Sequence, residues 1–102
     1  MSALATSSQR FDLDTLEPFL VRVSEFIPCG FGEMEIAQVV GTAERLKRGE
    51  EDELAFQIER DGEPSRLRIN LRLDDGDLPD VRFFAPPGLA ELIDGEIKRL
   101  DG

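Results

Sequence analysis

Four arginines and one phenylalanine are the residues of this chain best suited to bind a ligand or a partner. They are Arg66, Arg68, Arg72, Arg82 and Phe84. A guanidinium group binds carboxylates and phosphates through paired hydrogen bonds, and an aromatic ring beside it adds a stacking surface. The net charge of the chain is −10, so these arginines would form a basic patch on an otherwise acidic surface. We expect this patch to contact a partner.

Three interpretations of the patch are open. In the first, the arginines bind another protein, which includes a second copy of the chain in a sheet-to-sheet homodimer. In the second, they hold a small anionic ligand or stack single-stranded nucleic acid. In the third, they pair with Glu59 and Glu35 on neighbouring strands and bind nothing.

Groups suited to catalysis are scarce. The chain has no His, Trp or Tyr and a single cysteine, Cys29. This cysteine lies in the sequence CGFG, which matches no phosphate-binding loop, and no histidine is present to activate the thiol. Carboxylate pairs such as Glu33 and Glu35 are expected on a solvent-facing surface, where burial does not prepare them for acid catalysis. We therefore expect a non-enzymatic protein without a cofactor.

Two acidic loops offer a different contact surface. Residues 50–53 and 74–80 are rich in Asp and Glu, and an acidic surface speeds the encounter with a basic protein at low salt. The spacing in 74–80 does not match a calcium-binding EF-hand loop, so we expect no metal. Such loops can also imitate the phosphates of DNA. This imitation requires an uninterrupted acidic stripe, and Lys47, Arg48 and Arg60 interrupt the stripe here.

The composition narrows the class of protein. The chain has 22 acidic and 12 basic residues, a balance that repels nucleic acid and anionic membranes. A lone cysteine forms no internal disulfide, which is typical of a reducing compartment. No signal-peptide pattern opens the sequence, and no stretch approaches the roughly 20 apolar residues of a membrane span. We expect a cytoplasmic protein without a membrane segment, for which nucleic acid is the less favoured partner.

A β-hairpin over residues 54–73 is the strongest structural signal. Apolar and polar residues alternate on both sides of Asp61-Gly62, and this period of two places the apolar residues on one face. A two-residue type I′ turn at Asp61-Gly62 pairs Phe56 with Leu67 and Leu54 with Ile69. A four-residue loop over 61–64 keeps the same faces.

The remaining segments complete an α-β-β-β-β-α order. We expect a flexible tail over 1–10 and a single α+β domain over 11–102. Helical spacing follows a cap at Asp14 and returns after Pro87, whereas 33–46 and 81–85 are expected to be strands, with an uncertain register beyond Gly41. The predicted fold is a two-layer sandwich, in which a four-stranded antiparallel meander carries both helices on one face. The other face stays open and displays the arginines.

Overall fold

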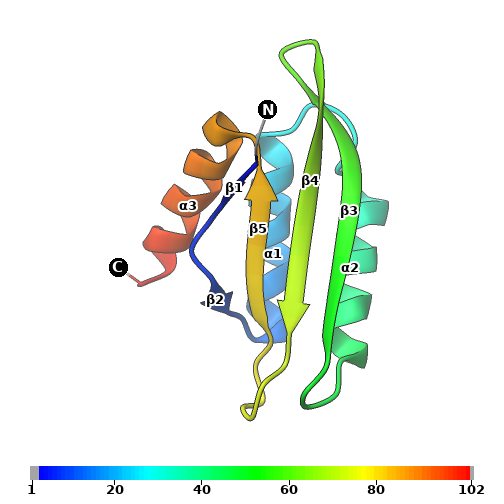
Figure 1. Cartoon of the computed structure of the whole chain (residues 1–102), viewed down its shortest axis with the longest axis vertical. Helices are drawn as coiled ribbons and strands as arrows, with labels where there is room; N and C mark the ends of the chain where they lie inside the picture. Colours follow the sequence, from blue (N-terminus) through cyan, green and yellow to red (C-terminus); the bar gives the residue numbers. More distant parts are fainter. Residues whose placement is uncertain (1–2, 102) are drawn as a thin grey trace.

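The computed structural model describes residues 3–101 and has an α+β fold, with three helices and an antiparallel sheet (Figure 1). In chain order the elements are β1 (Leu4–Ala5), β2 (Gln9–Arg10), α1 (Leu13–Glu25), α2 (Glu33–Arg45), β3 (Glu51–Arg60), β4 (Glu63–Arg72), β5 (Asp80–Ala85) and α3 (Pro87–Asp101). The sheet order is β1-β5-β4-β3, and β2 also pairs with β5. The predicted α+β class, antiparallel meander and terminal helices are confirmed.

The central hairpin has the predicted register. Phe56 pairs with Leu67 and Leu54 with Ile69 across β3 and β4. Asp61 and Gly62 both have positive φ angles, 54° and 78°, as the two central residues of a type I′ turn require. Because both strands keep this register over their whole length, every buried side chain of the hairpin reaches the same face.

The segment 33–46 is a helix, and the prediction of a strand there is wrong. Residues 33–45 form α2, and its buried side chains are Ile36, Val39, Thr42 and Ala43. Their spacing of three and four residues is helical. Met34, expected beside Ile36 on a buried strand face, is 75% exposed. The register question beyond Gly41 therefore does not arise, and the meander has three long strands, β3, β4 and β5.

The N-cap of helix α1 lies two residues before the expected cap. Asp12, not Asp14, is the N-cap residue, and its Oδ1 accepts a 2.8 Å hydrogen bond from the backbone N–H of Thr15. This bond satisfies one of the N–H groups that a helix leaves free at its start. Leu16 and Phe19 of α1 are buried in the core.

Residues 4–10 line the edge of the sheet, where the sequence suggested a tail without contacts. Strand β1 pairs with the end of β5, and β2 pairs with its beginning. Between them Thr6 is buried, donates its backbone N–H to Phe83 O at 2.9 Å, and accepts from Phe83 N through Oγ1 at 3.2 Å. Residues 1 and 2 of the predicted tail lie outside the described residues.

The core lies between one face of the sheet and the helices. In Figure 1, α1 and α2 lie behind the sheet and α3 lies beside β1. Alternate residues of β4 and β5 point into this core and are fully buried: Leu67, Ile69, Leu71, Val81 and Phe83. The residues between them face the viewer of Figure 1 and are at least partly exposed, so this face of the sheet is open. Among residues 3–101 no helix has the length and apolarity that a membrane crossing requires.

Candidate functional site

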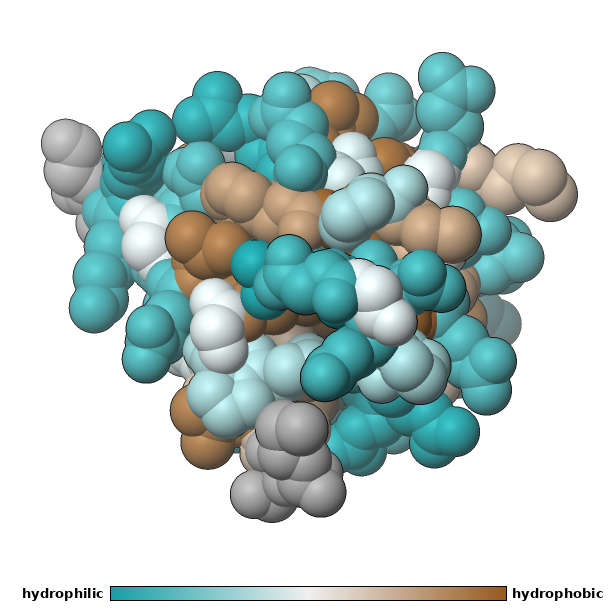
Figure 2. Space-filling view, turned by 90° about the horizontal axis from the view of Figure 1, so that it is seen from above, coloured by the Kyte–Doolittle hydropathy of each residue, from teal (hydrophilic) through white to brown (hydrophobic). Residues whose placement is uncertain are grey.

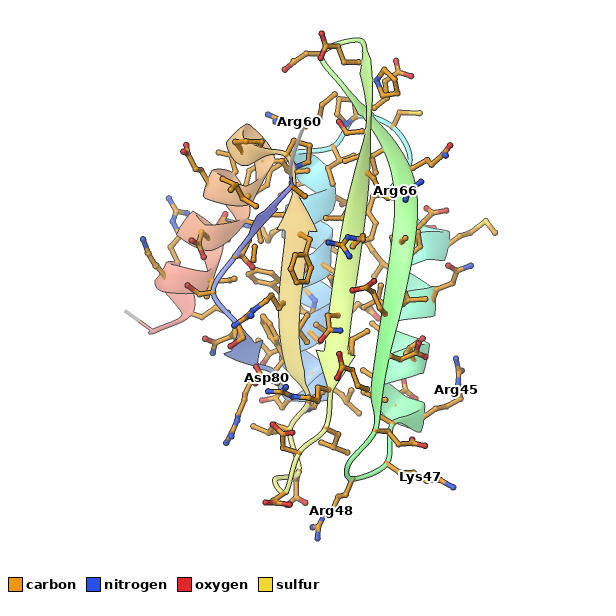
Figure 3. The ribbon with its side chains drawn as sticks, in the orientation of Figure 1. Arg45, Lys47, Arg48, Arg60, Arg66 and Asp80 are labelled. Atoms are coloured by element: carbon orange, nitrogen blue, oxygen red, sulfur yellow. The ribbon has the colours of Figure 1, made fainter. Side chains whose placement is uncertain are left out.

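The structure brings all five predicted site residues to the open face of the sheet. Arg66, Arg68 and Arg72 alternate with buried leucine and isoleucine on β4, and Arg82 and Phe84 alternate with buried residues on β5. Figure 3 labels Arg66 near the upper end of this face and Asp80 near its lower end. The alternation of polar and apolar residues in the sequence is the signal that located them.

Arg68 and Phe84 form the centre of the face. They are direct cross-strand neighbours, and the guanidinium carbon of Arg68 lies 4.6 Å from the centroid of the Phe84 ring. Arg68 Nη1 also lies 3.4 Å from Glu53 Oε2 on β3. The guanidinium is thus attracted both to an aromatic face and to a carboxylate, two contacts that fix its position on the open face.

Part of the expected cross-strand pairing is present, with different partners. Arg68 pairs with Glu53, whereas the sequence suggested Glu59 and Glu35. Glu35 belongs to α2 and its carboxylate accepts a 2.7 Å hydrogen bond from the backbone N–H of Gly32. Because the segment holding Glu35 is a helix, this residue is not a strand neighbour of the arginines.

The lower end of the face is also internally paired. Arg72 Nε lies 3.2 Å from Asp74 Oδ1, and Asn70 donates a 2.8 Å hydrogen bond to Glu51 Oε2. A hollow of about 220 Å³ opens here, lined by Ser8, Glu51, Asn70, Arg72, Asp80, Arg82 and Phe84. Its lining carries both charges, so it is a weaker anion site than arginines alone would make.

Arg66 and Arg82 are the two arginines of the face that stay available. Both are exposed, and neither has a carboxylate within 4.0 Å in the part of the chain that the structure describes. An exposed, unpaired guanidinium keeps all its donors for an incoming carboxylate or phosphate. These two residues are therefore the strongest candidates for direct contact with a partner.

Sequence reasoning missed the surroundings of Arg66. A hollow of about 510 Å³ is lined by Cys29, Arg66 and neighbouring residues of β3 and β4, and another of about 500 Å³ is lined by Arg66, the tip of the hairpin and residues 86–88. No local pattern connects Cys29 with β3, because the bridge between Cys29 and Glu59 joins residues far apart in the chain. Figure 2, which views this end from above, shows hydrophobic surface among hydrophilic side chains.

The two acidic loops lie at the opposite end of the sheet. The backbone N–H of Gly49 donates to Leu73 O at 2.7 Å, and Arg48 Nη2 lies 3.1 Å from Asp77 Oδ1. The loop before β3 and the loop after β4 therefore lie side by side. Among the described side chains, no group of three or more His, Cys, Asp or Glu is placed to hold a metal ion.

An acidic strip runs beside the arginines on the same face. Glu51, Glu53 and Glu59 are odd-numbered residues of β3, and the odd-numbered residues of β3 pair with the even-numbered residues of β4, which include Arg66 and Arg68. The three glutamates therefore point to the same side of the sheet as these arginines. The open face is therefore divided into a basic centre on β4 and β5 and an acidic margin on β3.

No family model matches the chain, and neither a curated protein nor a solved structure is significantly similar to it.

Proposed function

We propose that this chain is a non-enzymatic protein-binding protein, of the kind that inhibits, neutralises, adapts or escorts another protein in the cytoplasm. Its contact surface is the open face, with Arg66, Arg68, Arg72, Arg82 and Phe84. The observation that carries the proposal is the pair of exposed arginines, Arg66 and Arg82, which have no carboxylate partner among the described residues although acidic residues dominate the chain. Such guanidinium groups bind an acidic segment of a partner well.

The geometry of Phe84 favours a protein partner over single-stranded nucleic acid. Base stacking needs an accessible aromatic face, whereas the Phe84 ring is only partly exposed and carries Arg68 over its face. Glu53 beside Arg68, and Asp80 in the hollow that Phe84 also lines, add negative charge to this part of the open face, which repels a phosphate backbone. The second candidate function is the binding of a small anionic ligand. Arg72 and Arg82, which both line the hollow of about 220 Å³, support it.

Charge reversal at the two unpaired arginines tests the proposal. We expect Arg66→Glu combined with Arg82→Glu to weaken partner binding by at least about 10-fold, because both contacts become repulsive. The matched control is Arg45→Glu combined with Lys47→Glu, which changes the net charge equally. Figure 3 shows Arg45 and Lys47 at the lower end of α2 and beyond it, away from Arg66.

The control separates a specific contact from a general effect of charge. If both double variants lose binding equally, the partner responds to net charge and the open face is not the contact surface. A sheet-to-sheet homodimer is the other occupant to consider. Sedimentation of the unmodified chain as a dimer, and of the Arg66→Glu, Arg82→Glu variant as a monomer, would identify the second copy as the partner.

A further inference from the structure

One edge of the sheet is covered by short strands, whereas the other edge is largely unpaired. Residues 4–5 and 9–10 pair with β5 and cover one edge. At the other edge β3 is the last strand, and its one further pairing among residues 3–101 is an isolated bridge between Cys29 and Glu59. A ten-residue edge strand with unpaired backbone groups is a template for another strand.

The hairpin register tells which backbone groups of β3 point outward. Arg60 and Glu63 flank a two-residue turn and form a hydrogen-bonded pair, so the even-numbered residues of β3 bond to β4. The odd-numbered residues then direct N–H and C=O away from the sheet. The bond from Glu59 N to Cys29 O, 3.0 Å, agrees with this assignment. Glu51, Glu53 and Ala55 therefore present outward backbone groups.

The connector between α1 and α2 limits the free length of this edge. A side chain at Gly30 would collide with the backbone of Gln57 and lie 2.8 Å from Ile58 Cα, so the connector covers the end of β3 nearest the hairpin tip. Because the outward carbonyl of Gln57 is covered in this way, the open part of the edge is residues 51–56. Strands of this length are common in sheets, and an added strand of similar length fits the free edge.

The chemistry along this edge selects a basic strand. The sequence of 51–56 is EDELAF, which contains three carboxylates and no basic residue. Every second side chain of an added strand would lie on the open face, beside Glu51, Glu53 and Ala55. On the other face it would meet the partly buried Leu54 and Val40, where α2 lies behind β3 (Figure 1). Opposite charges on neighbouring strands attract, so alternating basic and apolar residues suit the site.

Self-association at this edge is disfavoured by the same charges. Antiparallel pairing of two copies within 51–56 would bring Glu51, Asp52 and Glu53 of both copies onto one ladder, and the paired segments themselves would add no cation. Charged edge strands resist pairing with themselves for this reason. A strand of opposite charge meets no such barrier.

We propose that the 51–56 edge of β3 binds an extended basic segment of a partner protein by antiparallel strand addition. The segment alternates Lys or Arg with apolar residues. This inference rests on the proposed role in protein binding but concerns a different surface from Arg66 and Arg82, so either surface can fail without the other. A contact of this kind combines backbone pairing with charge selection.

The test uses the synthetic peptide KVKVKVK with blocked termini and measures its affinity by calorimetry. In antiparallel pairing the lysine residues would carry the backbone N–H groups that face β3. Methylation of the lysine backbone nitrogens is expected to weaken binding at least about 10-fold, whereas methylation of the valine nitrogens is not. The peptide EVEVEVE is expected not to bind.

Variants of the protein complete the test. Glu51→Lys combined with Glu53→Lys is expected to weaken KVKVKVK binding at least about 10-fold. Arg66→Glu combined with Arg82→Glu is expected to leave it unweakened, which distinguishes this site from the open face. Absence of KVKVKVK binding would overturn the proposal, because it would show that the edge binds no basic strand. Equal binding by the two methylated peptides would also overturn it, because it would show that backbone pairing makes no contribution.

Discussion

The guanidinium group of Arg68 lies over the ring of Phe84, 4.6 Å from its centroid, on directly paired positions of β4 and β5. This contact joins the two central strands of the open face. It also fills space above the ring that a nucleic acid base would need. The structural relationship therefore bears on both the stability of the sheet and the kind of partner that the face accepts.

The Arg68–Phe84 contact predicts a measurable coupling. We expect Arg68→Met and Phe84→Leu, combined in a double-mutant cycle, to show a coupling of about 0.5–1 kcal/mol in the free energy of unfolding. Urea denaturation of the four proteins measures it. The cycle of Glu53→Gln with Phe84→Leu is the control, because Glu53 contacts Arg68 and not the ring. Strict additivity in the first cycle would show that the contact contributes nothing.

Gly30 is the glycine whose replacement should destabilise the protein most. Its φ angle is +101°, and a Cβ atom there would meet the backbone of Gln57 and Ile58. Gly30→Ala combines an unfavourable backbone conformation with a collision, so we expect a loss of at least about 2 kcal/mol in the free energy of unfolding.

Two other glycines separate these contributions. Gly62 has a φ of +78° but open space around it, so Gly62→Ala should cost only the backbone term of about 1–2 kcal/mol. Gly76 has open space and no positive φ, so Gly76→Ala should be nearly neutral. Thermal and urea denaturation give the order. A Gly30→Ala protein as stable as Gly62→Ala would contradict the close approach to β3.

Thr6 is predicted to fix the N-terminal segment against β5. Thr6→Val keeps the shape of the side chain but removes the Oγ1 that accepts from Phe83 N. Because that N–H is buried, we expect a loss of about 1–3 kcal/mol in the free energy of unfolding. Thr6→Ser keeps the hydroxyl and should lose less. Equal losses in the two variants would show that the hydroxyl makes no contribution.

Charge reversal at Arg66 and Arg82 should leave the fold intact. Both side chains are exposed and neither makes an ion pair within the described residues, so each change is expected to alter the free energy of unfolding by less than about 0.5 kcal/mol. Urea denaturation and far-UV circular dichroism check this. A larger loss would mean that any effect on binding reflects unfolding.

The hairpin and the five site residues were predictable because their pattern is local. Alternation fixes which side chains share a face, and Asp61-Gly62 fixes the register through the turn. The side chains of Arg68 and Phe84 were thereby placed on one face. Their stacking was not predictable, since it depends on the register between β4 and β5, which are joined by a long loop.

The prediction of a strand over 33–46 is wrong because two patterns compete in this segment. Met34 and Ile36 suggested alternation, and Val39-Val40 added β-branched residues that favour strands. The helical signal was present in the spacing of Ile36, Val39 and Ala43, and in Glu35 three residues after the N-cap Gly32. A longer window would have shown the period of 3.6 residues.

The edges of the sheet lay beyond local sequence reasoning. Strands β1 and β2 have two residues each, too few to show a period. Their pairing with β5, and the bridge between Cys29 and Glu59, depend on the folded position of distant segments. These contacts nevertheless decide which sheet edge is covered and which stays free.

A quantitative pull-down decides whether the open face binds a protein. The unmodified chain, the Arg66→Glu, Arg82→Glu variant and the Arg45→Glu, Lys47→Glu control serve as baits in lysate of the producing cells, and both protein and nucleic acid in the eluates are measured. We predict a stoichiometric protein partner with the unmodified chain and the control, and its loss with the Arg66→Glu, Arg82→Glu variant. Co-elution of nucleic acid alone, or a partner held equally by all three baits, would contradict the proposed function of this face.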